Sequence, residues 1–221
     1  MSTLANAHTV ILGLLRRPMA EVIEQARKVV ALIPDLQPAG HYRVSRWSDD
    51  GAEHEIIAQH KYADRRALPA VPEAPTKFNQ VSYPLYADGV PGYVAEMSLL
   101  IRSYPESVSV DFIFMGNALE GLGASWIIKT LDAFLPPMGI ESGILCDLED
   151  TGTTINRVVA GEPLTDLIAA RLKGKDPLPP PLLAVVKAER VDPEVWDAAR
   201  DGGVNIRMTP KGFAVFLTVK L

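Results

Sequence analysis

The carboxylates between Asp147 and Asp150 come nearest, among the residues of this chain, to a known catalytic pattern. Asp150 is followed by Thr151 and Gly152, the triplet with which aspartic proteases present a catalytic aspartate. That chemistry needs two carboxylates that share one proton. The chain holds no second triplet of this kind, and Glu149 stands where the protease pattern has an apolar residue. We therefore interpret the segment as an acidic loop.

The same loop, Asp147–Thr153, loosely follows the pattern of phosphatases that use an aspartate as nucleophile. Their pattern is Asp, any residue, Asp, Gly and Thr after an apolar strand. Here Glu149 takes the place of the second aspartate, and Asp150 displaces the glycine. A magnesium ion would need further acidic ligands from elsewhere in the chain. A small hydrolase or phosphatase-like enzyme that uses this loop is the alternative function that the sequence leaves open.

Two other motifs lack a required residue or spacing, and the one cysteine stands alone. His54 and His60 lie six residues apart, whereas the zinc-binding helix of a metalloprotease needs histidines four apart. Gly121-Leu122-Gly123 resembles the start of a dinucleotide fingerprint, but its third glycine position is Trp126. The single cysteine, Cys146, has leucines close by and is expected to be a buried thiol. We therefore predict no catalytic residue, no metal site and no cofactor, and expect a protein that is not an enzyme.

The composition is that of an ordinary globular protein. The chain has 221 residues, of which 48% are hydrophobic and 22% are charged. Its formal net charge of −5 argues against non-specific nucleic-acid binding but allows a basic protein partner. Val10–Leu15 is apolar but far shorter than the roughly 20 residues of a membrane-spanning helix. Because Arg16 and Arg17 follow this run, its charge order is wrong for a signal peptide, and we expect a cytoplasmic protein without a membrane partner.

The most regular patterning lies in the middle of the chain. Apolar residues alternate with mostly polar ones in Tyr93–Ser103 and Val108–Phe114, which predicts two strands with one buried face each. Asn117 and Glu120 then resemble a capping box. Apolar residues at helical spacing follow up to residue 135, before two prolines. This unit predicts a helix packed on an antiparallel sheet.

Periodicity also places most of the other elements. Helices are predicted at 18–33, at 163–173 and from Asp192, and strands at 9–15, 41–47, 143–146, 154–159, 204–207 and 213–221. Residues 52–67 are ambiguous, but their Ala, Glu and Gln content favours a short helix. The proline-rich segments 68–91 and 176–181 are interpreted as an irregular connection and a stiff linker.

These elements predict the fold class. Helices do not alternate strictly with strands, so an α+β fold is favoured over a doubly wound α/β sheet. We expect one domain over residues 1–221, an antiparallel β-sheet with packed α-helices. Its sheet should contain residues 93–103, 108–114 and 213–221, and the helices at 18–33 and 117–135 should cover it. The core should include Phe112, Phe114, Ile127, Leu131 and Phe134.

Two tryptophan segments carry a resemblance to a known family. Trp47 is followed by Ser48-Asp49-Asp50-Gly51, and Trp196–Arg200 is followed by Gly202-Gly203 and a closing hairpin. These segments are similar to the early tryptophan block and to the end of the immunity protein 52 family of bacterial polymorphic-toxin systems. The resemblance implies a cytosolic α+β protein that binds and neutralises one cognate toxin. Such a toxin is often a nuclease delivered by a contact-dependent or type VI secretion system.

An acidic surface fits that implied function. A nuclease active site is basic because it holds phosphates, so a blocking partner gains rate and specificity from carboxylates. We favour a first acidic segment beside Trp47 and keep a second as an alternative. Their predicted partner-binding residues are Asp49, Asp50, Glu53 and Glu55, and then Asp147, Glu149 and Asp150. We therefore predict a stoichiometric toxin inhibitor, with a structural or chaperone-like adaptor as a third class.

Overall fold

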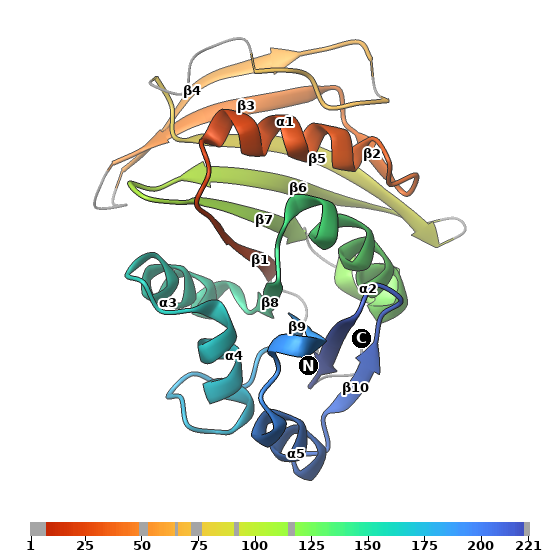
Figure 1. The fold of residues 1–221 in the computed structure, drawn as a ribbon. Coiled ribbons are helices and arrows are strands. Elements are labelled where there is room, and N and C mark those ends of the chain that lie inside the picture. The colour runs from red at the N-terminus through yellow and green to blue at the C-terminus, as the bar shows by residue number, and fades with distance from the viewer. Residues whose placement is uncertain are drawn as a thin grey trace.

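One antiparallel sheet of eleven strands runs through the computed structural model, which describes residues 8–48, 53–64, 66–71, 77–90, 93–114 and 118–218. The strand order is β10-β11-β9-β8-β1-β7-β6-β5-β3-β4, with β2 beside β5 (Figure 1). The strands are β1 (His8–Leu15), β2 (Leu36–Pro38), β3 (His41–Trp47), β4 (His54–Lys61), β5 (Gln80–Val90), β6 (Tyr93–Ser103), β7 (Val108–Phe114), β8 (Ser142–Cys146), β9 (Leu183–Lys187), β10 (Asn205–Met208) and β11 (Phe213–Leu217). The helices are α1 (Met19–Val30), α2 (Ala118–Met138), α3 (Leu148–Val159), α4 (Leu164–Leu172) and α5 (Pro193–Asp201), with a short 3-10 helix at Ala188–Arg190.

This architecture confirms the α+β fold. The three strands predicted from clean alternation, β6, β7 and β11, all lie in the one sheet. β6 and β7 pair directly, with Leu99 opposite Phe112 and Ile101 opposite Val110. Because successive side chains of a strand point to opposite faces, the alternation had correctly shown which residues share a buried face.

Helices α1 and α2 cover one face of the sheet, which we call the first face. In Figure 1, α1 lies in front of the upper strands and α2 to the right of the lower strands, because the sheet twists between them. The predicted core residues are all buried on this face: Phe112, Phe114, Ile127, Leu131 and Phe134. The rings of Phe112 and Phe134 meet edge to face, with their centroids 5.0 Å apart. The predicted packing of β7 against α2 is therefore confirmed.

Helices α3, α4 and α5 pack on the opposite, second face, over the C-terminal strands. Along β9, Leu183 and Val185 belong to the core beneath α2, whereas Ala184 and Val186 belong to the core beneath α4 and α5. β8 and β11 divide their side chains in the same way. Burial on both faces explains why these strands read as nearly continuous apolar runs.

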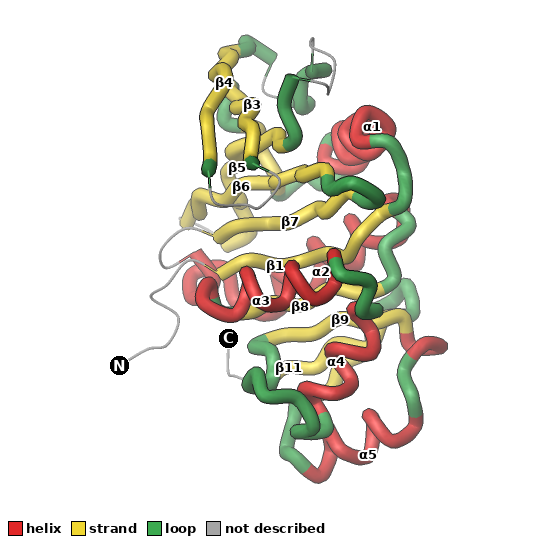
Figure 2. Tube along the Cα trace, turned by 90° about the vertical axis from the view of Figure 1, so that its left-hand side faces the viewer, coloured by secondary structure: helices red, strands yellow, loops and turns green. Residues whose placement is uncertain are grey.

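Over β5 and β6 the second face is largely bare, whereas Ser109 and Asp111 on the same face of β7 are buried. Ser82, Pro84 and Leu100 lie on this face, are half-exposed, and belong to neither buried core. In Figure 2 no described helix lies in front of β5 and β6, whereas α3 lies in front of β1 and β8. The molecule is therefore three layers thick around β8, β9 and β11 but two layers thick around β5 and β6.

Residues 52–67 contain a strand, which corrects the predicted short helix. β4 pairs with β3 from His41 opposite Lys61 to Trp47 opposite His54. The helix propensity of Ala, Glu and Gln is a weak preference, and pairing with a neighbouring strand overrides it.

The acidic segment after Cys146 begins a helix, which corrects the predicted loop and the predicted strand at 154–159. α3 starts directly after Asp147 and continues to Val159. Its residues Ile155 and Val158 pack into the core shared with α4. The β-branched threonines of this segment favour a strand locally, but the helix buries its apolar side against β1 and β8.

Three further boundaries differ from the sequence-based prediction. β5 starts at Gln80 within the segment interpreted as an irregular connection, and β9 follows the proline linker without having been predicted. Pro136 and Pro137 lie inside the last turn of α2, which ends at Met138. α2 also contains a kink at Gly123, whose φ of +72° an L-residue with a side chain rarely adopts. The predicted capping residue Asn117 lies outside the described residues.

Candidate functional site

The first acidic segment lies at a free edge of the sheet, in the hairpin formed by β3 and β4. β4 is the last strand of the sheet and pairs with β3 on one side. Glu53 and Glu55 are exposed there, while Asp49 and Asp50 lie outside the described residues. Ile56 is 55% exposed and Ile57 is 36% exposed beside these carboxylates. An edge strand that displays apolar and acidic side chains together is a candidate protein-binding surface.

A β-bulge presents the two isoleucines. Val44 pairs with Ala58 and Ser45 pairs with Ile56, so Ile57 is an extra residue on β4. A bulge twists an edge strand away from the plane of its sheet, which disfavours pairing with a further strand. We therefore expect a partner to contact the side chains of β4 rather than to extend the sheet.

Trp47 connects this hairpin to the rest of the sheet. Its backbone N–H donates to Asn79 Oδ1 at 2.8 Å, and its carbonyl accepts from Asn79 Nδ2 at 2.9 Å. Its indole Nε1–H donates to Gln80 Oε1 at 3.0 Å. The imidazole ring of His54 stacks on the indole with a centroid distance of 4.4 Å. Trp47, which belongs to a segment that carries the family resemblance, thus joins the turn end of the acidic hairpin to the start of β5.

The guanidinium of Arg102 lies between two aromatic rings. Its central carbon is 4.6 Å from the centroid of Trp47 and 5.0 Å from the centroid of Tyr104. His54, Trp47, Arg102 and Tyr104 together form a row that we call the cation stack. The row joins β4 and β3 to the end of β6 across the start of β5. Sequence reasoning missed it, because three separate segments contribute and no local pattern marks them.

A buried carboxylate lies beside the cation stack. Asp111 on β7 is 6% exposed, and its Oδ2 accepts from Ser109 Oγ at 3.0 Å. Among the described residues, neither its Oδ1 nor Nε of Arg102 has a hydrogen-bond partner. Burial raises the pKa of Asp111 to about 7, although the Ser109 hydrogen bond and the charge of Arg102 act in the opposite direction. Buried polar atoms without partners are rare in folded proteins, so this pair marks an incomplete network.

The second acidic segment is tied to the interior. Asp150 forms an ion pair with Arg171 at 3.1 Å, and Arg171 is 1% exposed. Arg171 also donates to the carbonyl of Pro179 at 2.6 Å and to Thr154 Oγ1 at 3.4 Å. Asp147 is the residue before α3, and its carbonyl accepts from Thr151. The side chain of Glu149 is not among those described.

The same network contains Cys146. Arg171 donates to Cys146 Sγ at 3.4 Å, and the thiol is buried. Burial raises the pKa of this thiol, against the opposing charge of Arg171. The predicted buried thiol is confirmed, and its raised pKa disfavours the reactive thiolate.

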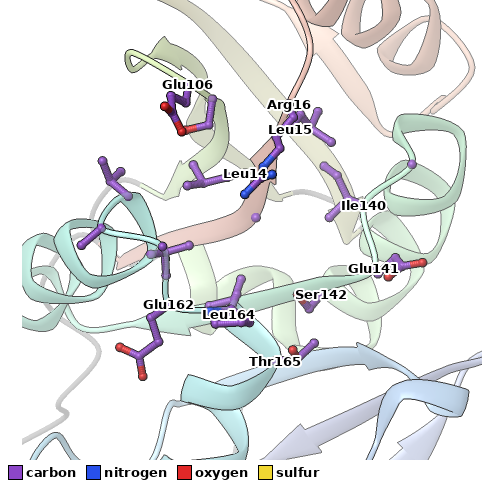
Figure 3. Close-up of a pocket in the computed structure, with 18 residues that line it drawn as sticks. Leu14, Leu15, Arg16, Glu106, Ile140, Glu141, Ser142, Glu162, Leu164 and Thr165 are labelled. Carbon is purple, nitrogen blue, oxygen red and sulfur yellow. The ribbon is translucent and has the colours of Figure 1, made fainter.

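A cleft of about 490 Å³ opens where β1 and β8 diverge (Figure 3). The two strands pair from Thr9 to Ile11, and a bulge at Gly13, whose φ is +91°, then turns β1 away. Glu106, Glu141, Glu162 and Arg16 line the cleft. Two of these carboxylates are already paired, Glu141 with Arg190 at 3.4 Å and Glu162 with Arg157 at 2.7 Å. A glycine inside a predicted strand was the one sequence signal for this opening.

Among the described residues, no group of three or more His, Cys, Asp or Glu side chains is placed to hold a metal ion. None of the described helices combines the length and apolar character needed to cross a membrane.

Comparisons with known proteins leave the family open. No family model matches the chain, and neither does any curated protein. Among solved structures, the chain is similar to the Pseudomonas aeruginosa T6SS protein PA0821, with 10% sequence identity and a TM-score of 0.37. The match covers 96% of this chain and 64% of that chain, so this chain spans less than two thirds of the other protein. A TM-score of this size carries no argument about fold or function, and the resemblance to the immunity protein 52 family stays a prediction.

Proposed function

We propose that this protein is an immunity protein that binds and neutralises a cognate bacterial toxin by stoichiometric contact. The observation that carries the proposal is the β4 edge, where the exposed Glu53 and Glu55 precede the exposed Ile56 and Ile57. Exposed apolar side chains next to charged ones on a sheet edge suit a protein partner. The resemblance of the Trp47 and Trp196 segments to the immunity protein 52 family supports the same function.

The partner that fits this surface is a basic protein. The chain carries a net charge of −5, and the carboxylates of β4 are exposed and available for pairing. A secreted nuclease has a basic active site because that site holds phosphates. Carboxylates placed over such a site would attract the toxin and occupy the phosphate positions. The proposed mechanism is therefore occlusion, and it needs no catalytic residue in this chain.

The alternative of a hydrolase at Asp147–Thr153 gains less support. Asp150 already pairs with the buried Arg171, and the Thr151 hydroxyl donates to the carbonyl of Asp147 within the first turn of α3. A nucleophilic aspartate needs an open approach and acidic neighbours that hold a metal ion. The contacts of Asp150 instead fit a structural role between α3 and α4.

Co-expression with the toxin encoded beside this protein in its genome tests the proposal. Glu53→Lys combined with Glu55→Lys should weaken toxin affinity at least about tenfold, or about 1.4 kcal/mol, and reduce protection of the host cell. Asp197→Lys combined with Asp201→Lys makes the same charge change on α5, at the other end of the molecule (Figure 1). This control should leave affinity and protection intact.

Two results would contradict the proposal. If no encoded neighbour binds the protein, the immunity function is wrong. If the toxin binds but the β4 and α5 variants weaken it equally, the function stands and the assigned surface is wrong.

A further inference from the structure

Arg102 and Asp111 occupy neighbouring positions on the second face, where Arg102 is half-buried and Asp111 is buried. Leu100 pairs with Asp111 and Arg102 pairs with Ser109, so Arg102 and Asp111 are diagonal neighbours on adjacent strands. Diagonal neighbours lie about 7–8 Å apart at the backbone, within reach of an arginine side chain. Each of the two side chains keeps one buried polar atom without a partner, Nε in Arg102 and Oδ1 in Asp111. The arrangement therefore contains a possible ion pair that is not made.

The cation stack explains why the pair is not made. Arg102 places its guanidinium between the rings of Trp47 and Tyr104. A neutral aspartic acid offers it little attraction, and burial favours the neutral form of Asp111. An ionised Asp111 would instead offer charge-assisted hydrogen bonds, which are about twice as strong as neutral ones. The position of Arg102 therefore depends on the proton of Asp111.

We propose that Arg102 is a positioning residue for the β3–β4 hairpin and that Asp111 sets its position. With Asp111 protonated, Arg102 stays in the cation stack and holds Trp47 and the stacked His54 in place. With Asp111 ionised, Arg102 leaves the stack and pairs with the carboxylate. Trp47 then keeps its hydrogen bonds to Asn79 and Gln80 but loses the guanidinium from one face of its ring. The hairpin that carries Glu53 and Glu55 is held less firmly in this second state.

The surroundings of Asp111 contain few other charged groups among the described residues. Ser109 lies beside it on β7 and donates to it, and Arg102 faces it from β6. Tyr104, directly after β6, is the other titratable group nearby, and burial raises the pKa of its phenol. On the opposite side, β1 places Ile11 across from Asp111. Arg102 is therefore the cation that can respond to this carboxylate.

Nuclear magnetic resonance of the protein alone, between pH 5.5 and 8.5, tests the movement. The indole N–H signal of Trp47 should shift with pH in the wild type, with a midpoint near the pKa of about 7 given for Asp111. Asp111→Asn keeps the shape of the side chain but cannot ionise, and it leaves every other group of the protein, His54 included, unchanged. The part of the Trp47 transition that is lost in Asp111→Asn therefore belongs to Asp111. Arg102→Gln should lose the same part, whichever state Asp111 is in.

The outcomes separate the two proposals. An identical Trp47 transition in the wild type and in Asp111→Asn would overturn the positioning role of Arg102. The effect on partner binding rests on the proposed function, and it should appear as an affinity about two- to fivefold lower at pH 8 than at pH 6, the size of one cation–π contact. Asp111→Asn should reduce this difference. A Trp47 transition that depends on Asp111, together with a toxin affinity that does not change with pH, would support the movement and place the toxin on another surface.

Discussion

Two regions of the sheet differ in how a buried ionisable side chain is paired. In the three-layered C-terminal part, Arg171 is 1% exposed and donates to Asp150, to Thr154 and to the carbonyl of Pro179. In the middle of the sheet, on β7, Asp111 is 6% exposed, and one of its oxygens has no partner among the described residues. A satisfied buried network makes the surrounding structure rigid, whereas an incomplete one can change its partners. The network of Arg171 therefore suits a structural role, whereas Asp111 is suited to change its partner when it gains or loses a proton.

Coverage by helices accounts for this difference. Arg171 extends from α4, and its partners come from α3, which carries Asp150 and Thr154, and from Pro179 in the segment after α4. Asp111 lies on the second face of β7, where the neighbouring strands β5 and β6 carry half-exposed side chains. The half-exposed face of β5 and β6 thus lies next to the hairpin that we propose as the contact surface. The helix-covered face of the C-terminal strands contains the fully paired network of Arg171.

The largest expected effect comes from an aromatic side chain on the covered face. Phe216 is fully buried beneath α5 and its ring lies 5.5 Å from that of Trp196. Phe216→Ala should lower the free energy of unfolding by about 3–5 kcal/mol, because it removes buried area and leaves a cavity. Leu100→Ala on the half-exposed face should cost less than about 1.5 kcal/mol, since only part of that side chain is buried. Chemical denaturation of both variants measures the difference, and equal losses would refute the contrast between the two faces.

The second expected effect concerns the satisfied buried charge. Arg171→Met should destabilise the protein by about 3 kcal/mol, because it leaves the carboxylate of Asp150 unpaired and the carbonyl of Pro179 without its donor. Lys28→Met removes an exposed pair with Glu24, 3.6 Å apart, and should cost no more than about 1 kcal/mol. Urea unfolding of the two variants under identical conditions checks this ratio. A tolerated Arg171→Met would show that the network is not needed for stability.

The third expected effect is a pH dependence from Asp111. Its folded pKa of about 7 lies above the ordinary value of 3.8, so folding favours the protonated form. The associated stability is fully present below about pH 4, is lost as the pH rises towards 7, and changes no further above that. Within this window, each pH unit removes up to about 1.4 kcal/mol. Asp111→Asn should therefore become more stable relative to the wild type as the pH rises from 4 to 7, which unfolding curves at several pH values will show.

The opposite pH dependence of stability would show that Asp111 is not protonated in the folded protein. If Asp111→Asn loses stability relative to the wild type as the pH rises, the carboxylate is ionised and paired in the folded protein. Ser98→Ala, which changes a half-exposed residue of the same face on β6, serves as a control without a titratable group. It should give the same pH dependence as the wild type.

The smallest expected effect on stability belongs to the β4 edge. Ile56→Ser should change the free energy of unfolding by less than about 0.5 kcal/mol, because the side chain is already 55% exposed. The same variant should still weaken toxin binding, because exposed apolar groups at an interface lose their hydration only in the complex. Thermal unfolding and calorimetric titration of the same sample provide both numbers. A large loss of stability would mean that Ile56 supports the fold rather than the contact.

Local patterns in the sequence were sufficient for the elements whose evidence is contained in one segment. The alternation in Tyr93–Ser103 and Val108–Phe114 identified β6, β7 and the face that each buries. Asp192 caps α5 as its position before Pro193 indicated, with its Oδ1 accepting from the N–H of Glu194 at 2.9 Å. These predictions succeeded because side-chain periodicity and capping act between residues that are close in the chain.

Tertiary structure decided the elements whose local preferences were weak. β4 became a strand because β3 pairs with it, and α3 became a helix because one side of it packs on β1 and β8. The candidate site was equally non-local, since Trp47, Arg102 and Asp111 come from three strands and meet at one end of the sheet. The acidic residues around Trp47 could be proposed from the sequence, but the partner of each charge could not. Burial and the distance to other charges set the free energy of a charged group. Neither quantity can be read from the order of the residues in the chain.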